Sequence, residues 1–130
     1  MIEKLKKHSD KLYFLFRVLV GFLFFQHGAQ KLFGWFSSKG AVQLVSLMGL
    51  AGVIEFAVGI LVLLGLFTRI ASVFGAITMF VAYFMVHASK AITPLANGGE
   101  LAVLYFAAFL VLIINGSKKW ALESKILKTK

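Results

Sequence analysis

Four long apolar runs constrain the fold of this chain more than any other feature of its sequence. They occupy residues 12–33, 49–67, 70–88 and 101–114. At about 1.5 Å per residue, the first three reach or approach the roughly 30 Å thickness of the hydrocarbon layer of a bilayer. The fourth covers only about 21 Å, so it needs further residues from 97–100 or 115–116. Because the runs lack the alternation of a strand, they predict membrane-spanning helices.

The composition agrees with a membrane protein. Of the 130 residues, 60% are hydrophobic and 15% are charged, too few charges to cover a soluble domain of this length. The basic start "MIEKLKKH" resembles a signal peptide, but the run after it is too long, contains Arg17 and lacks an A-x-A-like cleavage site. We therefore predict an all-α fold, a four-helix transmembrane bundle that forms one domain over residues 1–130. The predicted spans are residues 12–35, 49–67, 70–88 and 98–115.

The Lys and Arg residues indicate the orientation. Most of them precede the first run, lie in the short connection after the second, or follow the fourth: Lys4, Lys6, Lys7, Lys11, Arg69, Lys118, Lys119, Lys125, Lys128 and Lys130. The other two connections carry mainly Lys39 and Lys90. The positive-inside rule therefore predicts that both termini are cytoplasmic. The basic residues that give the net charge of +9 then face lipid. We expect no nucleic-acid partner, because no soluble basic surface is predicted.

The sequence contains no cysteine. This excludes disulfides, thiolate catalysis and cysteine-ligated iron–sulfur clusters within the chain. It also contains no GxGxxG or Walker-type loop, so we expect no nucleotide site.

Polar residues in all four runs fall at one depth. His27 lies about 22 Å, and His87 about 25 Å, above the cytoplasmic ends of their runs. Glu55 lies about 9 Å below the outer start of its run, a similar level, and Glu100 marks the outer mouth of the fourth. Ionisable residues in a membrane usually face a bundle interior or a water-filled cavity. We therefore predict a ligand pocket in the outer leaflet and assign no catalytic residues. The predicted lining consists of Gln26, His27, Gln30, Lys31, Glu55, Tyr83, His87 and Glu100.

Glycines share helix faces with charged residues. In the first run, two glycines lie on the face of Arg17 and Lys31, and in the second run two lie on the face of Glu55. Such faces let membrane helices approach closely, so they face protein and not lipid. We therefore expect Glu55 to approach Lys31 or His27 between the first two helices. These glycines are Gly21, Gly28, Gly52 and Gly59.

Each polar residue also has a structural interpretation. Arg17 is shallow, and we expect it to snorkel to the cytoplasmic surface, as Lys31 could toward the outer surface. Glu55 could form a purely structural buried hydrogen bond, and His27 and His87 could do the same between helices. Two histidines at similar depth could also ligate a haem. No supporting motif favours a haem, and we do not predict one.

Three stretches carry a resemblance to a known family: "FRVLVGFLFFQHGAQKLFGWF", "GVIEFAVGILVLLGLFTRIAS" and "NGGELAVLYFAAFLVLIINGS". Together with four spans and cytoplasmic ends, they resemble the DoxX family of small integral membrane proteins over nearly the whole chain. The chain departs from the family at its C-terminal end. The family often has Gly-x-Gly followed by a Ser-Leu-Asp-like segment there, and this chain has "NGSKKWALES".

The resemblance implies membrane redox chemistry, since the family is linked to thiosulfate and quinone oxidoreduction and to oxidative-stress complexes. It implies a multi-pass protein of a prokaryotic plasma membrane that binds quinone, quinol or another small apolar ligand and contacts partner redox subunits. A homo-oligomer is one of the states that the sequence allows. The predicted function is that of a small membrane protein whose outer-half polar pocket binds quinone or quinol, or which supports a membrane redox complex; whether it is itself an oxidoreductase subunit stays open. The alternatives are a non-catalytic structural or assembly subunit and a small-molecule transporter.

Overall fold

The computed structural model describes residues 1–127, which are helical or irregular and include no strand. The elements are α1 (Ile2–Lys7), α2 (Ser9–Phe33), α3 (Leu47–Leu64), α4 (Thr68–Ala82), η1 (Tyr83–His87), α5 (Pro94–Asn97), α6 (Glu100–Asn115) and α7 (Leu122–Ile126). Element η1 is one turn of π-helix that continues α4. The prediction of an all-α fold is therefore confirmed for the described residues.

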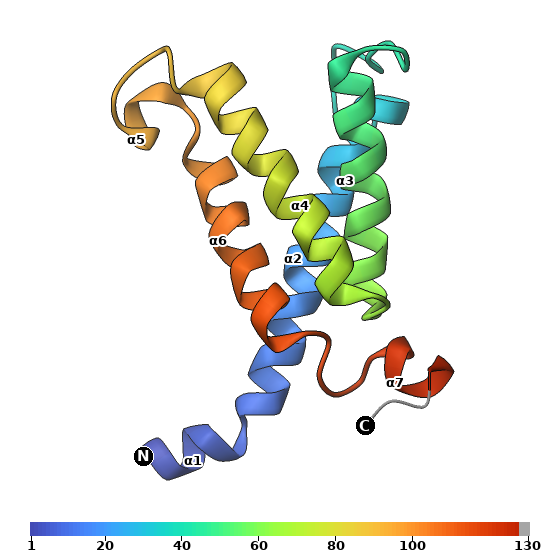
Figure 1. The fold of residues 1–130 in the computed structure, drawn as a ribbon, viewed down its shortest axis with the longest axis vertical. Helices are drawn as coiled ribbons and strands as arrows, with labels where there is room; N and C mark the ends of the chain where they lie inside the picture. Colours follow the sequence, from blue (N-terminus) through green and yellow to red (C-terminus); the bar gives the residue numbers. More distant parts are fainter. Residues whose placement is uncertain (128–130) are drawn as a thin grey trace.

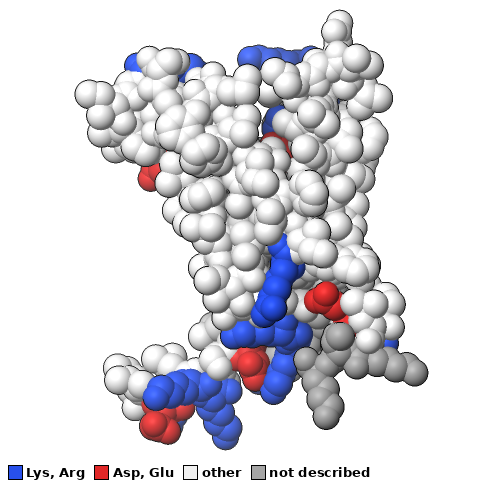
Figure 2. All heavy atoms as spheres, in the orientation of Figure 1, with Lys and Arg blue, Asp and Glu red and all other residues white. Residues whose placement is uncertain are grey.

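Three helical segments are long and apolar enough to cross a membrane, and they comprise Ser9–Phe33, Leu47–Leu64 and Thr68–His87. Helix α6 is also apolar but has only 16 residues, which correspond to about 24 Å of rise. Figure 2 shows a broad middle band with few charged atoms and a concentration of charged side chains at one end. Both features suit a chain whose middle lies in a bilayer.

The four longest helices form two pairs (Figure 1). Helix α2 packs mainly against α3, and α4 packs mainly against α6. The pairs lie close together at the end of the molecule where α1 and α7 are found, and they separate toward the opposite end. We call these the terminal end and the far end.

Close backbone contact joins α2 to α3. A Cβ atom on Gly28 would lie 2.3 Å from the backbone nitrogen of Phe56, and one on Gly21 would lie 2.4 Å from that of Leu63. On α3, a Cβ atom on Gly59 would likewise come within 2.4 Å of the backbone of α2. Only glycine permits so close an approach. The two predicted glycine faces therefore meet, and they fix the register of α2 against α3.

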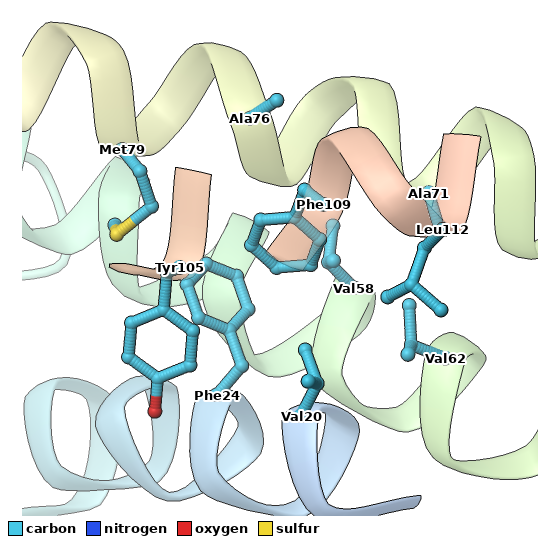
Figure 3. Packing of buried hydrophobic residues seen from close by; sticks show 10 residues of the cluster. All are labelled: Val20, Phe24, Val58, Val62, Ala71, Ala76, Met79, Tyr105, Phe109 and Leu112. Carbon is cyan, nitrogen blue, oxygen red and sulfur yellow. The ribbon is translucent and has the colours of Figure 1, made fainter. Parts of the chain in front are cut away.

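Aromatic side chains join the two helix pairs. Phe24 of α2 packs edge-to-face on Phe109 of α6, with 4.8 Å between ring centroids, and its ring lies 5.1 Å from that of Tyr105. Figure 3 shows these rings at the centre of the buried cluster. Gly75 of α4 leaves the space that Phe109 occupies, since a Cβ atom there would lie 2.6 Å from the ring. This core holds α4 and α6 against α2 and α3.

Arg17 does not snorkel to the surface, and that expectation is wrong. Arg17 is only 1% exposed to solvent. The guanidinium donates from Nη1 to the carbonyl oxygen of Ser117 at 2.6 Å and from Nη2 to that of Trp120 at 2.9 Å. The chain that follows α6 turns back at the terminal end and brings these carbonyl groups to Arg17. Both terminal nitrogens of the side chain therefore find acceptors inside the protein, whereas the buried Nε has no hydrogen-bond partner among the described residues.

Candidate functional site

A cavity of about 300 Å³ lies between the two helix pairs at the far end. Its wall includes the four ionisable residues His27, Lys31, Glu55 and His87 and the phenol of Tyr105. The remaining lining is mainly apolar: Phe24, Met48, Ala51, Met79, Ala82, Val86, Gly98, Leu101 and Ala102. Helices α2, α3, α4 and α6 and the π-helix η1 all contribute, so the cavity exists only because the two pairs separate here.

Lys31 and Glu55 form an ion pair on the cavity wall. Lys31 Nζ lies 2.7 Å from Glu55 Oε2, and the two side chains are 17% and 4% exposed. The absence of a Cβ on Gly52 allows this, because such an atom would lie 2.9 Å from Cβ of Lys31. The predicted approach of Glu55 to Lys31 is therefore confirmed. Lys31 points inward to this partner and not outward to the membrane surface.

His27 and Tyr105 supply further polar groups beside the ion pair. The ring of His27 meets the ring of Tyr105 edge-to-face, with 5.7 Å between centroids. Tyr105 is 7% exposed, and Figure 3 shows its hydroxyl pointing toward α2. Within residues 1–127, neither the imidazole nitrogens of His27 nor the hydroxyl of Tyr105 has a hydrogen-bond partner. Both side chains therefore offer unused hydrogen-bonding groups at the cavity.

His87 is held by the connection between η1 and α6. Its Nδ1 lies 3.2 Å from the carbonyl oxygen of Asn97, and the side-chain amide of Asn97 donates to the hydroxyl of Tyr83 at 3.0 Å. Asn97 is buried, and its Oδ1 accepts from the backbone N–H of Gly99 at 2.8 Å. The π-helix η1 brings Tyr83 and His87 to this asparagine. Single turns of π-helix often occur at functional sites.

The structure does not bring every predicted site residue to the cavity. His27, Lys31, Glu55 and His87 line it, whereas four others do not: Gln26, Gln30, Tyr83 and Glu100. The two glutamines lie half-buried on a neighbouring face of α2, and Glu100 is exposed at the start of α6. Tyr83 lines a separate apolar groove, accepts a hydrogen bond from Asn97, and has its ring 6.5 Å from that of the cavity residue His87.

Tyr105 is a cavity residue that the sequence-based prediction missed. It lies inside the fourth apolar run, where an aromatic residue is expected to contribute bulk. The depth of Tyr105 in the membrane could have indicated its role. Tyr105 follows the predicted outer mouth at Glu100 by five residues, which correspond to about 7.5 Å along the helix. That is close to the depth of Glu55 in the second run.

The arrangement suits a ligand with a polar head and an apolar body. One wall combines a buried ion pair, imidazoles and a phenol, and the other walls present methionine and aliphatic side chains. Sites of this kind use a few polar groups to orient a ligand and apolar surface to bind its bulk. Among residues 1–127, no group of three or more His, Cys, Asp or Glu side chains is placed to hold a metal ion.

Comparison with known proteins gives one family and two relatives. The family model described as DoxX matches residues 12–88. A protein of Haemophilus influenzae (strain ATCC 51907 / DSM 11121 / KW20 / Rd), named "Uncharacterized protein", is 37% identical over 134 residues, covering 98% of this chain and 99% of its own. A protein of Bacillus subtilis (strain 168), named "Putative oxidoreductase CatD", is 31% identical over 123 residues, covering 89% of this chain and 87% of its own. No solved structure matches this chain.

Proposed function

We propose that this chain, which belongs to the DoxX family, binds a quinone or quinol in its far-end cavity and works as a subunit of a membrane redox system. The observation that carries the proposal is the division of the cavity into one ionisable wall and several apolar walls. A quinone has the same division, with two ring oxygens and an apolar tail. The volume of about 300 Å³ accommodates the ring of a quinone.

The residues of the cavity would orient the ring and exchange its protons. His27 and the hydroxyl of Tyr105 would bond one ring oxygen, because both have unused hydrogen-bonding groups there. Imidazole groups commonly donate and accept protons in proteins, so His27 suits proton exchange. The Lys31–Glu55 pair would provide a fixed charged boundary beside it.

The electrons require a second component. Oxidation of a quinol to a quinone releases two electrons and two protons, and the cavity residues can take up only the protons. We therefore assign the electrons to a partner redox subunit. The Bacillus subtilis relative named as an oxidoreductase supports a redox role.

The proposal includes a topology of four spans in the plasma membrane, with α6 as the fourth and with cytoplasmic termini. The cavity then lies in the outer leaflet. Cysteines introduced in place of Lys39 and Lys90 should react with an impermeant reagent from outside the cell. Cysteines in place of Lys7 and Lys125 should react only after permeabilisation. If the cysteines in place of Lys7 and Lys125 were labelled from opposite sides of the membrane, the four-span arrangement would be wrong.

The ligand test measures how far a short-chain quinone analogue raises the thermal unfolding midpoint of the full chain in detergent. We expect protection of wild type and loss of protection in His27→Ala and Glu55→Gln. Gln26→Ala is the matched control, because Gln26 is the neighbour of His27 on α2 but does not line the cavity. This control should be protected like wild type. Protection of no variant, or equal protection of all four proteins, would exclude a quinone site built on these residues.

A further inference from the structure

A second group of charged side chains lies at the terminal end, far from the cavity. Lys118 belongs to the turn at residues 116–118, and the side chains of Arg17 and Arg69 reach the same turn. Arg17 donates to the carbonyl oxygen of Ser117 at 2.6 Å. A Cβ atom on Gly116 would lie 3.0 Å from Nε of Arg69. Three positive charges therefore converge on one turn of the chain.

Tyr13 of α2 anchors this turn. Its hydroxyl donates to the carbonyl oxygen of Gly116 at 2.6 Å, and Nζ of Lys118 lies 4.7 Å from the centroid of its ring. Arg69 donates from Nη2 to the carbonyl oxygen of Ile114 at 3.2 Å, and its other donors have no hydrogen-bond partner within residues 1–127. The side chains of Arg69 and Lys118 are exposed, so these unused groups are accessible.

Among the described residues, the two acidic side chains that line the same groove as Arg69 and Lys118 form no ion pair with this cluster. Asp10 pairs with Lys119 at 2.9 Å, and Oε2 of Glu123 accepts from the hydroxyl of Ser117 at 2.7 Å. Within residues 1–127, Arg17, Arg69 and Lys118 form no ion pair. Like charges held close together repel one another, and an anion bound between them would remove that repulsion.

The exposed part of the cluster borders an open groove of about 1150 Å³. Apolar side chains from Phe67, Ile70 and Trp120 line the same groove. Trp120 is 55% exposed and packs edge-on against Phe14, with 5.7 Å between ring centroids. Exposed tryptophan is typical of the level of lipid headgroups. The groove thus combines exposed cations with apolar surface, a combination that suits the level where a lipid phosphate meets its acyl chains.

We propose that this groove binds the phosphate of an anionic phospholipid, with Arg69 and Lys118 as its direct ligands and buried Arg17 adding to the positive potential. Basic pockets at the cytoplasmic side of membrane helices bind anionic lipid headgroups by this chemistry. Arg69 can form the bidentate contacts that phosphate oxygens favour. The site is independent of the far-end cavity and of the ligand proposed for it.

The test titrates three probes into the full chain in a neutral detergent: short-chain phosphatidylglycerol, short-chain phosphatidylcholine and inorganic phosphate. Thermal unfolding midpoints give the apparent affinity for each probe. Phosphatidylglycerol should raise the midpoint of wild type, and the other two probes should have little effect. The double variant Arg69→Gln/Lys118→Gln should bind phosphatidylglycerol more weakly by about fivefold for each cation removed.

The matched control is Lys39→Gln/Lys90→Gln, which removes the same charge outside the groove and should retain the affinity of wild type. Equal loss of affinity in both double variants would show a general charge effect and overturn the proposal. Inorganic phosphate acting as strongly as phosphatidylglycerol would also overturn it, because the site would then recognise a free anion. If the groove variant does not fold, the single variants Arg69→Gln and Lys118→Gln replace it, and unchanged affinity in both would count against the site.

Discussion

The contact between α2 and α3 and the opening between the two helix pairs are built in opposite ways. Along α2 and α3, glycines bring backbone against backbone, and a Cβ atom on Gly28 would lie 2.3 Å from its neighbour. At the far end, a cavity of about 300 Å³ separates that pair from α4 and α6. Lys31 and Glu55 belong to both regions, since they pair between α2 and α3 and also line the cavity.

The difference shows how an apolar chain can keep a charged site in place. A buried ion pair is stabilising only when its geometry is well fixed. Backbone contact between α2 and α3 supplies that fixed geometry, because the glycine faces allow one register. The opposite wall is formed by side chains and by the π-helix η1, which leave room for a ligand. Rigidity and space therefore come from different helices.

Breaking the ion pair should have the largest effect on stability. Lys31→Met leaves the Glu55 carboxylate buried without its cation, and we expect the free energy of unfolding to fall by about 3–5 kcal/mol. Glu55→Gln should cost less, because the flexible Lys31 can extend toward the membrane surface. Denaturant unfolding in detergent micelles measures both. In the double variant the loss should be smaller than the sum of the single losses, and strict additivity would show that the pair does not couple the two helices.

Filling the contact between α2 and α3 should have the next largest effect. The methyl group of Gly28→Ala would meet the backbone of Phe56, which cannot move aside as a side chain can. We expect a loss of about 3 kcal/mol in the free energy of unfolding. Gly40→Ala is the comparison, because a Cβ atom there has nothing within 4 Å and only its positive φ is unfavourable. An equal loss at both positions would mean that close approach of the helices is not the cause.

A smaller loss is expected between α4 and α6. The methyl group of Gly75→Ala would meet the ring of Phe109, and a ring can tilt, so we expect about 1–2 kcal/mol. Adding Phe109→Leu should recover part of that loss, because the smaller side chain makes room for the methyl group. Denaturant unfolding of the two single variants and the double variant gives the coupling. Absence of any recovery would show that this contact is as rigid as the one between α2 and α3.

Removing the hydroxyl of Tyr105 should have the smallest effect on stability. Because that hydroxyl has no hydrogen-bond partner within residues 1–127, Tyr105→Phe should change the free energy of unfolding by less than about 0.5 kcal/mol. Affinity for a quinone analogue should fall about five- to tenfold, the equivalent of one hydrogen bond. Titration of the analogue during thermal unfolding measures both. A stability loss above about 1 kcal/mol would mean that the hydroxyl supports the fold and not a ligand.

Much of the fold follows directly from the sequence. Helices α2 and α3 are continuous apolar runs, and each ends at a glycine with positive φ, Gly34 and Gly65. The shortness of α6 is also visible in its apolar run. The π-helix η1 has no comparable signal, because an extra residue in one turn depends on the packing around it. Helix α5 was missed although Thr93 caps it and Pro94 occupies its first turn, which is a recognised start signal.

The sequence predicts how deep the site residues lie along their helices, but it does not predict the direction in which their side chains point. The fixed rise of a helix places His27, Glu55 and His87 at one level, and all three line the cavity. The same count includes Gln26 and Gln30, and only the position of α6 decides which face of α2 meets the cavity. Arg17 was misjudged for a similar reason. Its hydrogen-bond acceptors lie 100 to 103 residues further along the chain, and no local pattern points to them.

That separation has a consequence for biosynthesis. A ribosome adds about 5–20 residues per second, so the carbonyl groups that receive Arg17 are made roughly 5–20 s after the arginine itself. During that interval the first helix carries a guanidinium whose native acceptors do not yet exist. Water or lipid headgroups must solvate it until translation reaches Trp120. Helix α2 is therefore made early, but its charged side chain reaches its final environment only when the segment that follows α6 has been synthesised.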